Sequence, residues 1–261
     1  MSNFDREHRI AEALARAAGR RMVRERGEGF SVEWKGENDP VTEVDLSIER
    51  FLTEELDALF PADRIYGEEL EADPADGTDR TWLIDPIDGT QNFSSGLPLF
   101  CVSIALTVDG RSVVGVVYDP TRDELFSAQR GDGAFLDERP LEVSDTETID
   151  DAVLVTGFPR SVEDGMVDNL RNFETLTRET RGVRRLGSAA LDLAYVAAGR
   201  LDGFWEYHLA PWDTAAGYLL VDEAGGRTSD TAGREYHPDR DSILASNGTL
   251  HEALVERLTS L

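Results

Sequence analysis

The chain has 261 residues, of which 40% are hydrophobic, so it is long enough to bury a substantial core and too apolar to be disordered. Its 52 Asp and Glu residues against 26 Lys and Arg give a formal net charge of −26, a surface that repels nucleic acids and anionic membranes. The one cysteine, Cys101, excludes an internal disulfide framework and a cysteine-rich metal site.

The ends and apolar stretches of the sequence indicate where the protein works. MSNFDREHRIAEAL at the N-terminus is charged throughout and unlike a signal peptide, and LPLFCVSIALTV is too short to cross a membrane. We therefore expect a soluble, cytoplasmic protein with no nucleic-acid or membrane partner. Lys35 is the only lysine, and acid excess with almost no lysine is typical of a high-salt cytoplasm, where counterions screen self-repulsion.

The first half of the chain predicts helices followed by a meander of strands. Residues 4–26 have apolar positions at helical spacing before Gly27, and residues 43–59 repeat this pattern before Pro61. After an acidic loop over 69–80 comes an apolar strand, TWLI, at 81–84. Asp-Gly and Pro signals divide residues 100–136 into apolar runs, which predicts an antiparallel meander.

The pattern changes near residue 150, where strands and helices begin to alternate. We expect strands at 152–158, 201–207 and 242–246, and helices at 163–180, 188–199, 213–226 and 249–260. The sequence therefore predicts an α/β protein with an α+β subdomain over 1–150, which carries most of the candidate site residues, and an α/β subdomain over 151–261.

Two nearly identical hexapeptides raise the main functional question. DPADGT at 73–78 lies in an acidic run and is typical of a surface turn. DPIDGT at 85–90 follows the TWLI strand, so Asp85 and Asp88 are expected together at the strand end, where they repel each other unless a cation lies between them. Such oxygen ligands suit Mg²⁺ or Mn²⁺. Gly89 and Thr90 would offer a phosphate their backbone amides at a helix N-terminus, although the six letters alone also fit an ordinary β-turn.

Other acidic stretches favour a functional interpretation. Glu68 follows the short apolar run RIY, the Thr42 and Asp45 pair begins the second predicted helix, and Asp213 is expected at a helix N-cap after Trp212. For each, a turn or cap is the alternative. Together with DPIDGT they indicate phosphoryl chemistry at a metal site.

These stretches resemble the signatures of the inositol monophosphatase family, metal-dependent and lithium-sensitive sugar phosphatases. WLIDPIDGTQNF is similar to the first signature and WDTAAGYLLVDEAGG to the second, while KGENDPVTEVD, GEE and residues 115–144 match in the family's order, over nearly the whole chain. The resemblance implies a layered αβαβα sandwich of the sugar phosphatase type. The charge composition would make the chain a haloarchaeal member.

The resemblance implies a set of metal ligands. Glu68, Asp85 and the Ile87 carbonyl would hold one Mg²⁺, Asp85, Asp88 and Asp213 a second, and Glu68 would help to place a weaker third. Mn²⁺ could replace Mg²⁺.

The resemblance also implies roles around the reacting phosphate. A metal-activated water would attack phosphorus, with its proton steered by Thr90 and Asp45, while the Gly89 and Thr90 amides hold the phosphate. The implied substrate contacts are Asp88, Arg185, Gly187, Ser188, Ala189, Glu206 and Asp213, with Arg185 meeting a second phosphate. Lys35 falls where family members carry a lysine near the metals, and chance survival is the alternative for it.

We therefore expect a Mg²⁺-dependent phosphomonoesterase, inhibited by lithium and dimeric as its relatives usually are. Its substrate would be a small phosphorylated metabolite, with myo-inositol 1-phosphate and fructose 1,6-bisphosphate as the leading candidates. One alternative is a phosphatase for nucleotides such as 3′-phosphoadenosine 5′-phosphate or NADP. Another is a non-catalytic metal-binding protein. A third is a scaffold protein whose acids only keep it soluble at high salt.

Overall fold

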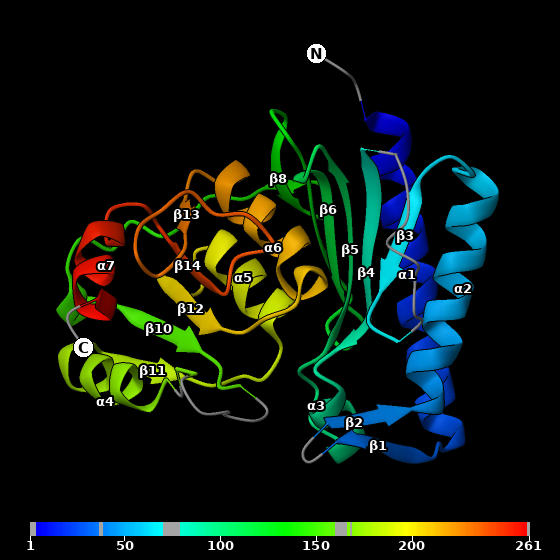
Figure 1. The fold of residues 1–261 in the computed structure, drawn as a ribbon, viewed down its shortest axis with the longest axis horizontal. Helices are drawn as coiled ribbons and strands as arrows, with labels where there is room; N and C mark the ends of the chain where they lie inside the picture. Colours follow the sequence, from blue (N-terminus) through cyan, green and yellow to red (C-terminus); the bar gives the residue numbers. More distant parts are fainter. Residues whose placement is uncertain (1–3, 37–38, 70–78, 160–165, 168, 260–261) are drawn as a thin grey trace.

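Helices and sheets alternate in layers in the computed structural model, which describes residues 4–36, 39–69, 79–159, 166–167 and 169–259 without the side chains of 34–36, 39 and 40. Figure 1 shows α1 and α2 on the outer face of the larger sheet, α5 and α6 between the two sheets, and α4 and α7 beyond the smaller sheet. This is the αβαβα order that the resemblance implied.

The larger sheet is built from the first half of the chain. Its seven strands lie in the order β3-β4-β5-β6-β7-β8-β9, with β3 parallel to β4 and the other pairs antiparallel. Its strands are β3 (Arg64–Gly67), β4 (Arg80–Asp88), β5 (Cys101–Val108), β6 (Arg111–Asp119), β7 (Glu124–Gln129), β8 (Gly133–Leu136) and β9 (Arg139–Pro140). The other elements of this half are α1 (Asp5–Glu28), the hairpin of β1 (Val32–Gly36) and β2 (Asp39–Thr42), α2 (Glu43–Leu59) and α3 (Thr90–Ser95).

The smaller sheet comes from the second half. Its order is β11-β10-β12-β14-β13, with β10 parallel to both of its neighbours and β14 antiparallel to its own. The strands are β10 (Val153–Thr156), β11 (Gly182–Arg184), β12 (Gly203–Tyr207), β13 (Arg227–Ser229) and β14 (Ser242–Ser246). The helices are η1 (Ile149–Asp151, a 3₁₀ turn), α4 (Leu170–Glu179), α5 (Ala189–Ala197), α6 (Pro211–Glu223) and α7 (His251–Thr259). The predicted division near residue 150 falls between the two sheets, and the two subdomains stay a prediction.

The core lies between the two sheets, around α5 and α6. A helix covered by sheets on both sides needs apolar residues all round, and Leu191, Leu193, Leu219 and Leu220 are fully buried accordingly. Close packing depends on Gly115 of β6, where an added Cβ would lie 2.7 Å from the carbonyl oxygen of Ala216 in α6. The sheet can approach this helix because the strand has no side chain there.

Most of the predicted elements are confirmed, with several differences, among them the short strands β11 and β13, which were not predicted. The strand predicted at 81–84 continues to Asp88, and the helix predicted from 163 begins at Leu170, since Asn169 before it adopts a left-handed φ of 63°. Residues 163–165 and 168 lie outside the described part. The β1–β2 hairpin was not predicted, because its apolar alternation is too short to recognise. No helix in the described ranges is both long and apolar enough to cross a bilayer.

A buried histidine beside the smaller sheet makes the stability of the fold depend on pH. His251 is fully buried at the start of α7, 2.8 Å from Ser229 Oγ and 2.9 Å from Ser246 Oγ. Burial, and then the charge of Arg227, lower its pKa from 6.5 to about 4. The unfolded chain therefore takes up a proton at a higher pH than the folded chain does.

We expect this group to stabilise the fold fully above pH 6.5 and to lose its contribution, roughly 3 kcal/mol at most, as the pH falls from 6.5 through 4. Urea unfolding at several pH values measures the slope. His251→Gln, which cannot titrate, should be less stable at neutral pH and show a shallower slope in this window. An unchanged slope in that variant would contradict the assignment.

Candidate active site

The DPIDGT segment closes strand β4 with an irregular pairing. Asp85 pairs with Ser103 and Asp88 with Cys101, so the two residues between the aspartates face a single residue of β5. Pro86 has no N–H to donate to the ladder, which favours such a bulge. The Ile87 amide instead donates to Asp85 Oδ1 at 3.0 Å. The bulge brings both carboxylates to the same end of the sheet.

Asp85 is 1% exposed and lies among other acids. Burial raises its pKa well above the usual range, and the carboxylates of Glu68, Asp88, Asp213 and Asp45 raise it further. The four charges that act most strongly on Asp85 are thus all negative. Without a cation this arrangement opposes ionisation of Asp85.

Asp88 is held by the N-terminal end of α5. Its Oδ2 accepts hydrogen bonds from Ser188 Oγ at 2.6 Å and from the Ala190 amide at 2.7 Å, and its Oδ1 accepts from the Ala189 amide at 3.2 Å. Cys101 Sγ lies 3.6 Å from Oδ2. Burial raises the pKa of Asp88, while these hydrogen bonds oppose that effect because they favour the ionised form.

The predicted pair of Asp45 and Thr90 is in contact. Thr42 and Asp45 form a capping box at the start of α2. The Thr42 side chain accepts from the Asp45 amide, and Asp45 Oδ2 accepts from the Thr42 amide at 2.9 Å. The other oxygen, Asp45 Oδ1, lies 3.2 Å from the Thr90 hydroxyl, which is also 3.0 Å from the Ile87 carbonyl oxygen. Gly89 caps α3 as predicted, with a φ of 97°. The start of α2 therefore packs against the DPIDGT turn.

Glu68 and Asp213 reach the site from two further elements. Glu68 follows β3, which is parallel to β4, and Asp213 lies in the first turn of α6. The predicted N-cap position of Asp213 is wrong: Ala210 is the N-cap and Pro211 the first helical residue, since proline is favoured at that position. Asp213 Oδ2 accepts from the Ala210 amide at 2.7 Å, so its carboxylate still faces the helix start.

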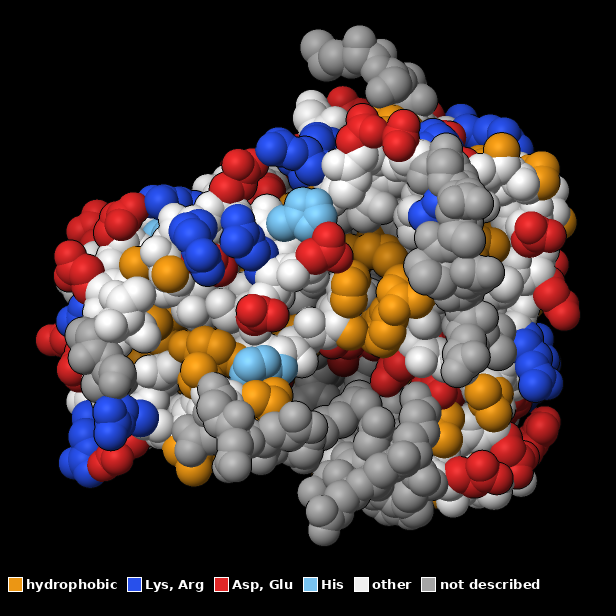
Figure 2. Space-filling view, in the orientation of Figure 1, with side chains coloured by type: hydrophobic (Ala, Val, Ile, Leu, Met, Phe, Trp, Pro, Cys, Tyr) orange, Lys and Arg blue, Asp and Glu red, His pale blue; other side chains and the backbone are white. Residues whose placement is uncertain are grey.

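These elements surround a cavity of about 320 Å³, visible as a hollow near the centre of Figure 2. Its wall includes most of the predicted site residues, namely Glu68, Asp88, Gly89, Thr90, Arg185, Gly187, Ser188, Ala189, Glu206 and Asp213. Asp45, Asp85 and Ile87 are buried behind that wall. The Lys35 side chain and the DPADGT segment lie outside the described residues.

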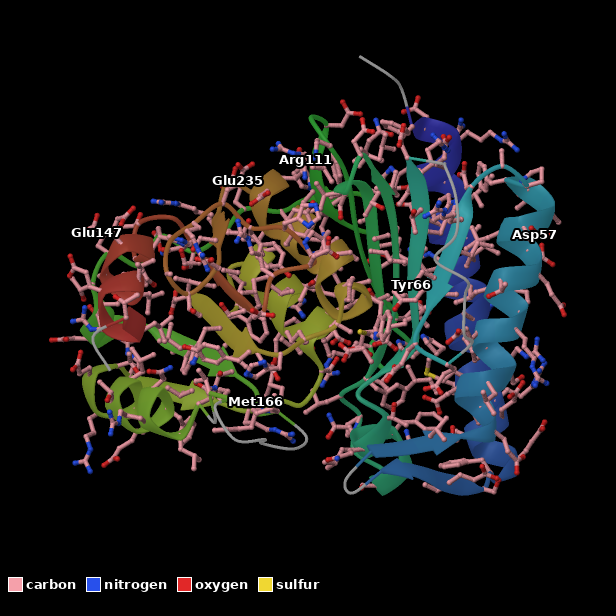
Figure 3. The ribbon with its side chains drawn as sticks, viewed as in Figure 1. Asp57, Tyr66, Arg111, Glu147, Met166 and Glu235 are labelled. Carbon is pink, nitrogen blue, oxygen red and sulfur yellow. The ribbon has the colours of Figure 1, made fainter. Side chains whose placement is uncertain are left out.

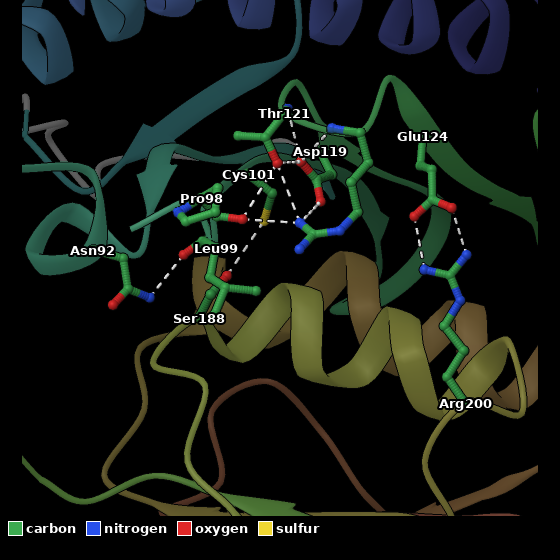
Figure 4. Close-up of polar contacts among 10 residues, drawn as sticks. Asn92, Pro98, Leu99, Cys101, Asp119, Thr121, Glu124, Ser188 and Arg200 are labelled. Carbon is green, nitrogen blue, oxygen red and sulfur yellow. Dashed lines mark hydrogen bonds and ion pairs between the residues drawn. The ribbon is translucent and has the colours of Figure 1, made fainter. Parts of the chain in front are cut away.

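The substrate side of the wall is tied to the DPIDGT side. The side-chain amide of Asn92, in α3, donates to the Leu99 carbonyl at 2.7 Å and to the Leu186 carbonyl at 2.8 Å. Cys101 Sγ lies 3.6 Å from Ser188 Oγ at the same junction, as Figure 4 shows. The turn before α5 is therefore fixed on α3 and on β5, the two elements that follow the DPIDGT segment.

Sequence reasoning missed several residues of the cavity wall. His208, a residue with a left-handed φ of 60°, and Asp192 of α5 both border the cavity. Met166, labelled in Figure 3, borders it from the C-terminal half. An acid within the otherwise apolar stretch SAALDLAYVAA was the available signal for Asp192, because a buried helix rarely carries a charge without a reason.

The donors present fit a hard divalent cation. Asp85, Asp88, Asp213 and Glu68 supply only oxygen atoms, the ligands that Mg²⁺ prefers. Within the described ranges, no three His, Cys, Asp or Glu side chains lie together in a group that could hold a metal ion. The metal assignment therefore rests on the charge and chemistry of these acids.

Comparison with known proteins identifies the family of the chain. The family model described as the inositol monophosphatase family matches residues 5–261. The chain belongs to the inositol monophosphatase family. Membership of the inositol monophosphatase family confirms the predicted enzyme class, a phosphoric monoester hydrolase, and this family is generally metal-dependent.

The relatives carry two kinds of name. Nus factor SuhB from Pseudomonas aeruginosa is 46% identical over 255 residues, 94% of this chain and 93% of that protein. Inositol-1-monophosphatase from Mesorhizobium japonicum is 44% identical over 247 residues, 93% of this chain and 92% of that protein. The solved inositol monophosphatase of Anabaena (Nostoc) has a TM-score of 0.89 and 38% identity, covering 100% of this chain and 98% of its own. None of these organisms is a haloarchaeon, so they do not support that predicted source.

Gly89 gives a test of the turn itself. A Cβ there would lie 2.9 Å from the Leu99 carbonyl oxygen, and the φ of 97° is strained for any other residue. We expect Gly89→Ala to lower the free energy of unfolding by about 1–3 kcal/mol and to reduce phosphate release. Urea unfolding and a phosphate assay measure the two effects.

The matched control is Gly131→Ala, because Gly131 has a similar φ of 88° and nothing within 4 Å of its added Cβ. Gly131→Ala should lower the free energy of unfolding only by the cost of a positive φ in alanine, and it should keep full activity. Equal losses in the two variants would show that the crowding between Leu99 and Gly89 has no effect.

Proposed function

We infer that this member of the family hydrolyses a small polyol or sugar phosphate, with Mg²⁺ as its cofactor. The observation that carries this proposal is the buried Asp85, which lies under the charge of four further carboxylates and directly before a turn that borders the cavity. When bound, Mg²⁺ lowers the pKa of a water molecule and neutralises charge on the phosphate oxygens. The ligands would be Glu68, Asp85, the Ile87 carbonyl, Asp88 and Asp213, for two or three ions.

The chain's own residues would bind and orient the phosphate. Gly89 and Thr90 begin α3 at the cavity wall, so their amides would hold phosphate oxygens. The Thr90 hydroxyl, within 3.2 Å of Asp45 Oδ1, can pass the proton of the attacking water to that carboxylate. Burial raises the pKa of Asp45, which makes it a better proton acceptor than an exposed aspartate.

The other wall supports the substrate class. Glu206, Arg185 and the turn of Gly187 also border the cavity. Carboxylates accept hydrogen bonds from hydroxyl groups, and an arginine suits a second phosphate. Myo-inositol 1-phosphate and fructose 1,6-bisphosphate fit these features, and nucleotide substrates such as 3′-phosphoadenosine 5′-phosphate or NADP remain the alternative.

Further properties are carried over as part of the proposal. Inhibition by lithium, a homodimeric state, a cytoplasmic location and adaptation to high salt are expectations from the family and from composition. The name Nus factor of one relative is not extended to this chain, since a formal net charge of −26 opposes direct contact with nucleic acid.

The metal site can be tested with paired variants. We expect Asp88→Asn to reduce Mg²⁺-dependent phosphate release by at least about 100-fold, since it removes charge beside the reacting phosphate. Asp57→Asn, on the outer helix α2 in Figure 3, should keep full activity, as should Asp76→Asn in the DPADGT copy at 73–78. Circular dichroism checks that each variant is folded. Similar activity in all three variants would refute the assignment.

A substrate panel tests the proposed class. Phosphate release from myo-inositol 1-phosphate, fructose 1,6-bisphosphate and 3′-phosphoadenosine 5′-phosphate is measured in high KCl, with and without Mg²⁺. We expect release that requires Mg²⁺ and favours one of the first two. Preference for the nucleotide would replace the proposed substrate class, and metal-independent release would overturn the proposed mechanism.

A further inference from the structure

Asp192 is a buried acid that the site described so far does not use. It lies in the first turn of α5, is 1% exposed and borders the cavity, and its Oδ1 atom has no hydrogen-bond partner. Burial raises the pKa of this carboxyl well above its usual range, Glu206 and Asp88 raise it further, and Arg185 opposes them. An unpaired buried oxygen costs on the order of 1–3 kcal/mol of stability, so its presence requires a reason.

The fold does not need Asp192 as a helix cap. An acid in a first turn commonly accepts bonds from the free amides there. In α5 the Ala189 and Ala190 amides already donate to Asp88, at 3.2 Å and 2.7 Å, and the Asp192 amide donates to the Ser188 carbonyl at 2.9 Å. The helix therefore does not need the Asp192 carboxyl to cap its first turn.

Glu206 gives the cavity a second carboxyl group from another element. It lies on β12, is buried, and is the charge that acts most strongly on Asp192. A Cβ on Gly157 would lie 2.1 Å from Glu206 Oε1, so the missing side chain at Gly157 makes room for this carboxylate. Two neighbouring carboxyl groups in one cavity offer acceptors that a ligand with hydroxyl groups can satisfy.

Building on the proposed function, we propose that Asp192 is a specificity-determining residue that, together with Glu206, binds hydroxyl groups of the substrate's ring. The preferred substrate is then a cyclic polyol or sugar phosphate with several free hydroxyls. An apolar alkyl phosphate of the same size would leave the Asp192 Oδ1 atom buried and unpaired. A site built to bind hydroxyls rejects such analogues strongly.

The experiment compares myo-inositol 1-phosphate with cyclohexyl phosphate, which has the same ring without hydroxyls. The wild type should prefer the first in kcat/KM. Asp192→Leu should reduce this preference at least about tenfold by raising KM for myo-inositol 1-phosphate, with cyclohexyl phosphate changed by less than about twofold. The substrate preference of Asp192→Asn, which keeps one acceptor oxygen, should lie between those of the wild type and Asp192→Leu. This variant provides the test if the leucine variant misfolds.

Stability separates recognition from structural support. Because the leucine removes an unpaired buried oxygen, the Tm of Asp192→Leu should equal or exceed that of the wild type. The matched control is Asp222→Asn, at a largely buried acid of α6 outside the cavity wall, which should leave the substrate preference unchanged.

The outcomes distinguish this inference from the proposed function. A folded wild type that releases no phosphate from myo-inositol 1-phosphate would overturn both. A wild type that prefers this substrate, with the preference intact in both Asp192 variants, would overturn the role of Asp192 alone. Equal losses with the two substrates, or a lowered Tm, would assign Asp192 to support of the fold.

Discussion

The carboxylate of Asp88 lies against the first turn of α5, where two backbone amides and the Ser188 hydroxyl donate to it. This contact joins the end of β4 in the larger sheet to a helix that also packs on the smaller sheet. It fixes the distance between the acids of DPIDGT and the Gly187 turn. Since both walls of the cavity depend on it, the Asp88 contact determines the geometry of the whole site.

Local signals predicted much of this arrangement. The apolar stripe of residues 43–59, closed by Thr42 before it and Pro61 after it, gave the bounds of α2 because capping and periodicity act within a few residues. The strand before Asp85 and the helix start at Gly89 were predictable for the same reason. The likeness to a known family then supplied the partners of Asp85, which no local pattern contains.

The parts that could not be predicted depend on contacts between distant segments. The bulge at Pro86 is defined only by its pairing with Cys101 and Ser103, and the continuation of β4 to Asp88 follows from it. The sequence marks Asp192 as an unusual acid in an apolar helix, but its position at the cavity is visible only in the structure, where Asp88 already accepts from the first amides of α5. Glu206 packs against Gly157, which lies 49 positions earlier in the chain. A Cβ added to Gly157 would lie 2.1 Å from Glu206 Oε1, so this contact depends on glycine.

The close packing of β6 on α6 fixes a dimension of the active site from some distance along the chain. Asp213 lies in the first turn of α6, the helix whose Ala216 carbonyl rests against Gly115. Because the obstacle is backbone on both sides, a methyl group at Gly115 could be accommodated only by moving the helix away from the sheet. Asp213 would move with it relative to Asp85 and Asp88. The separation between these carboxylates is therefore set in part by a residue that has no side chain and lies outside the cavity wall.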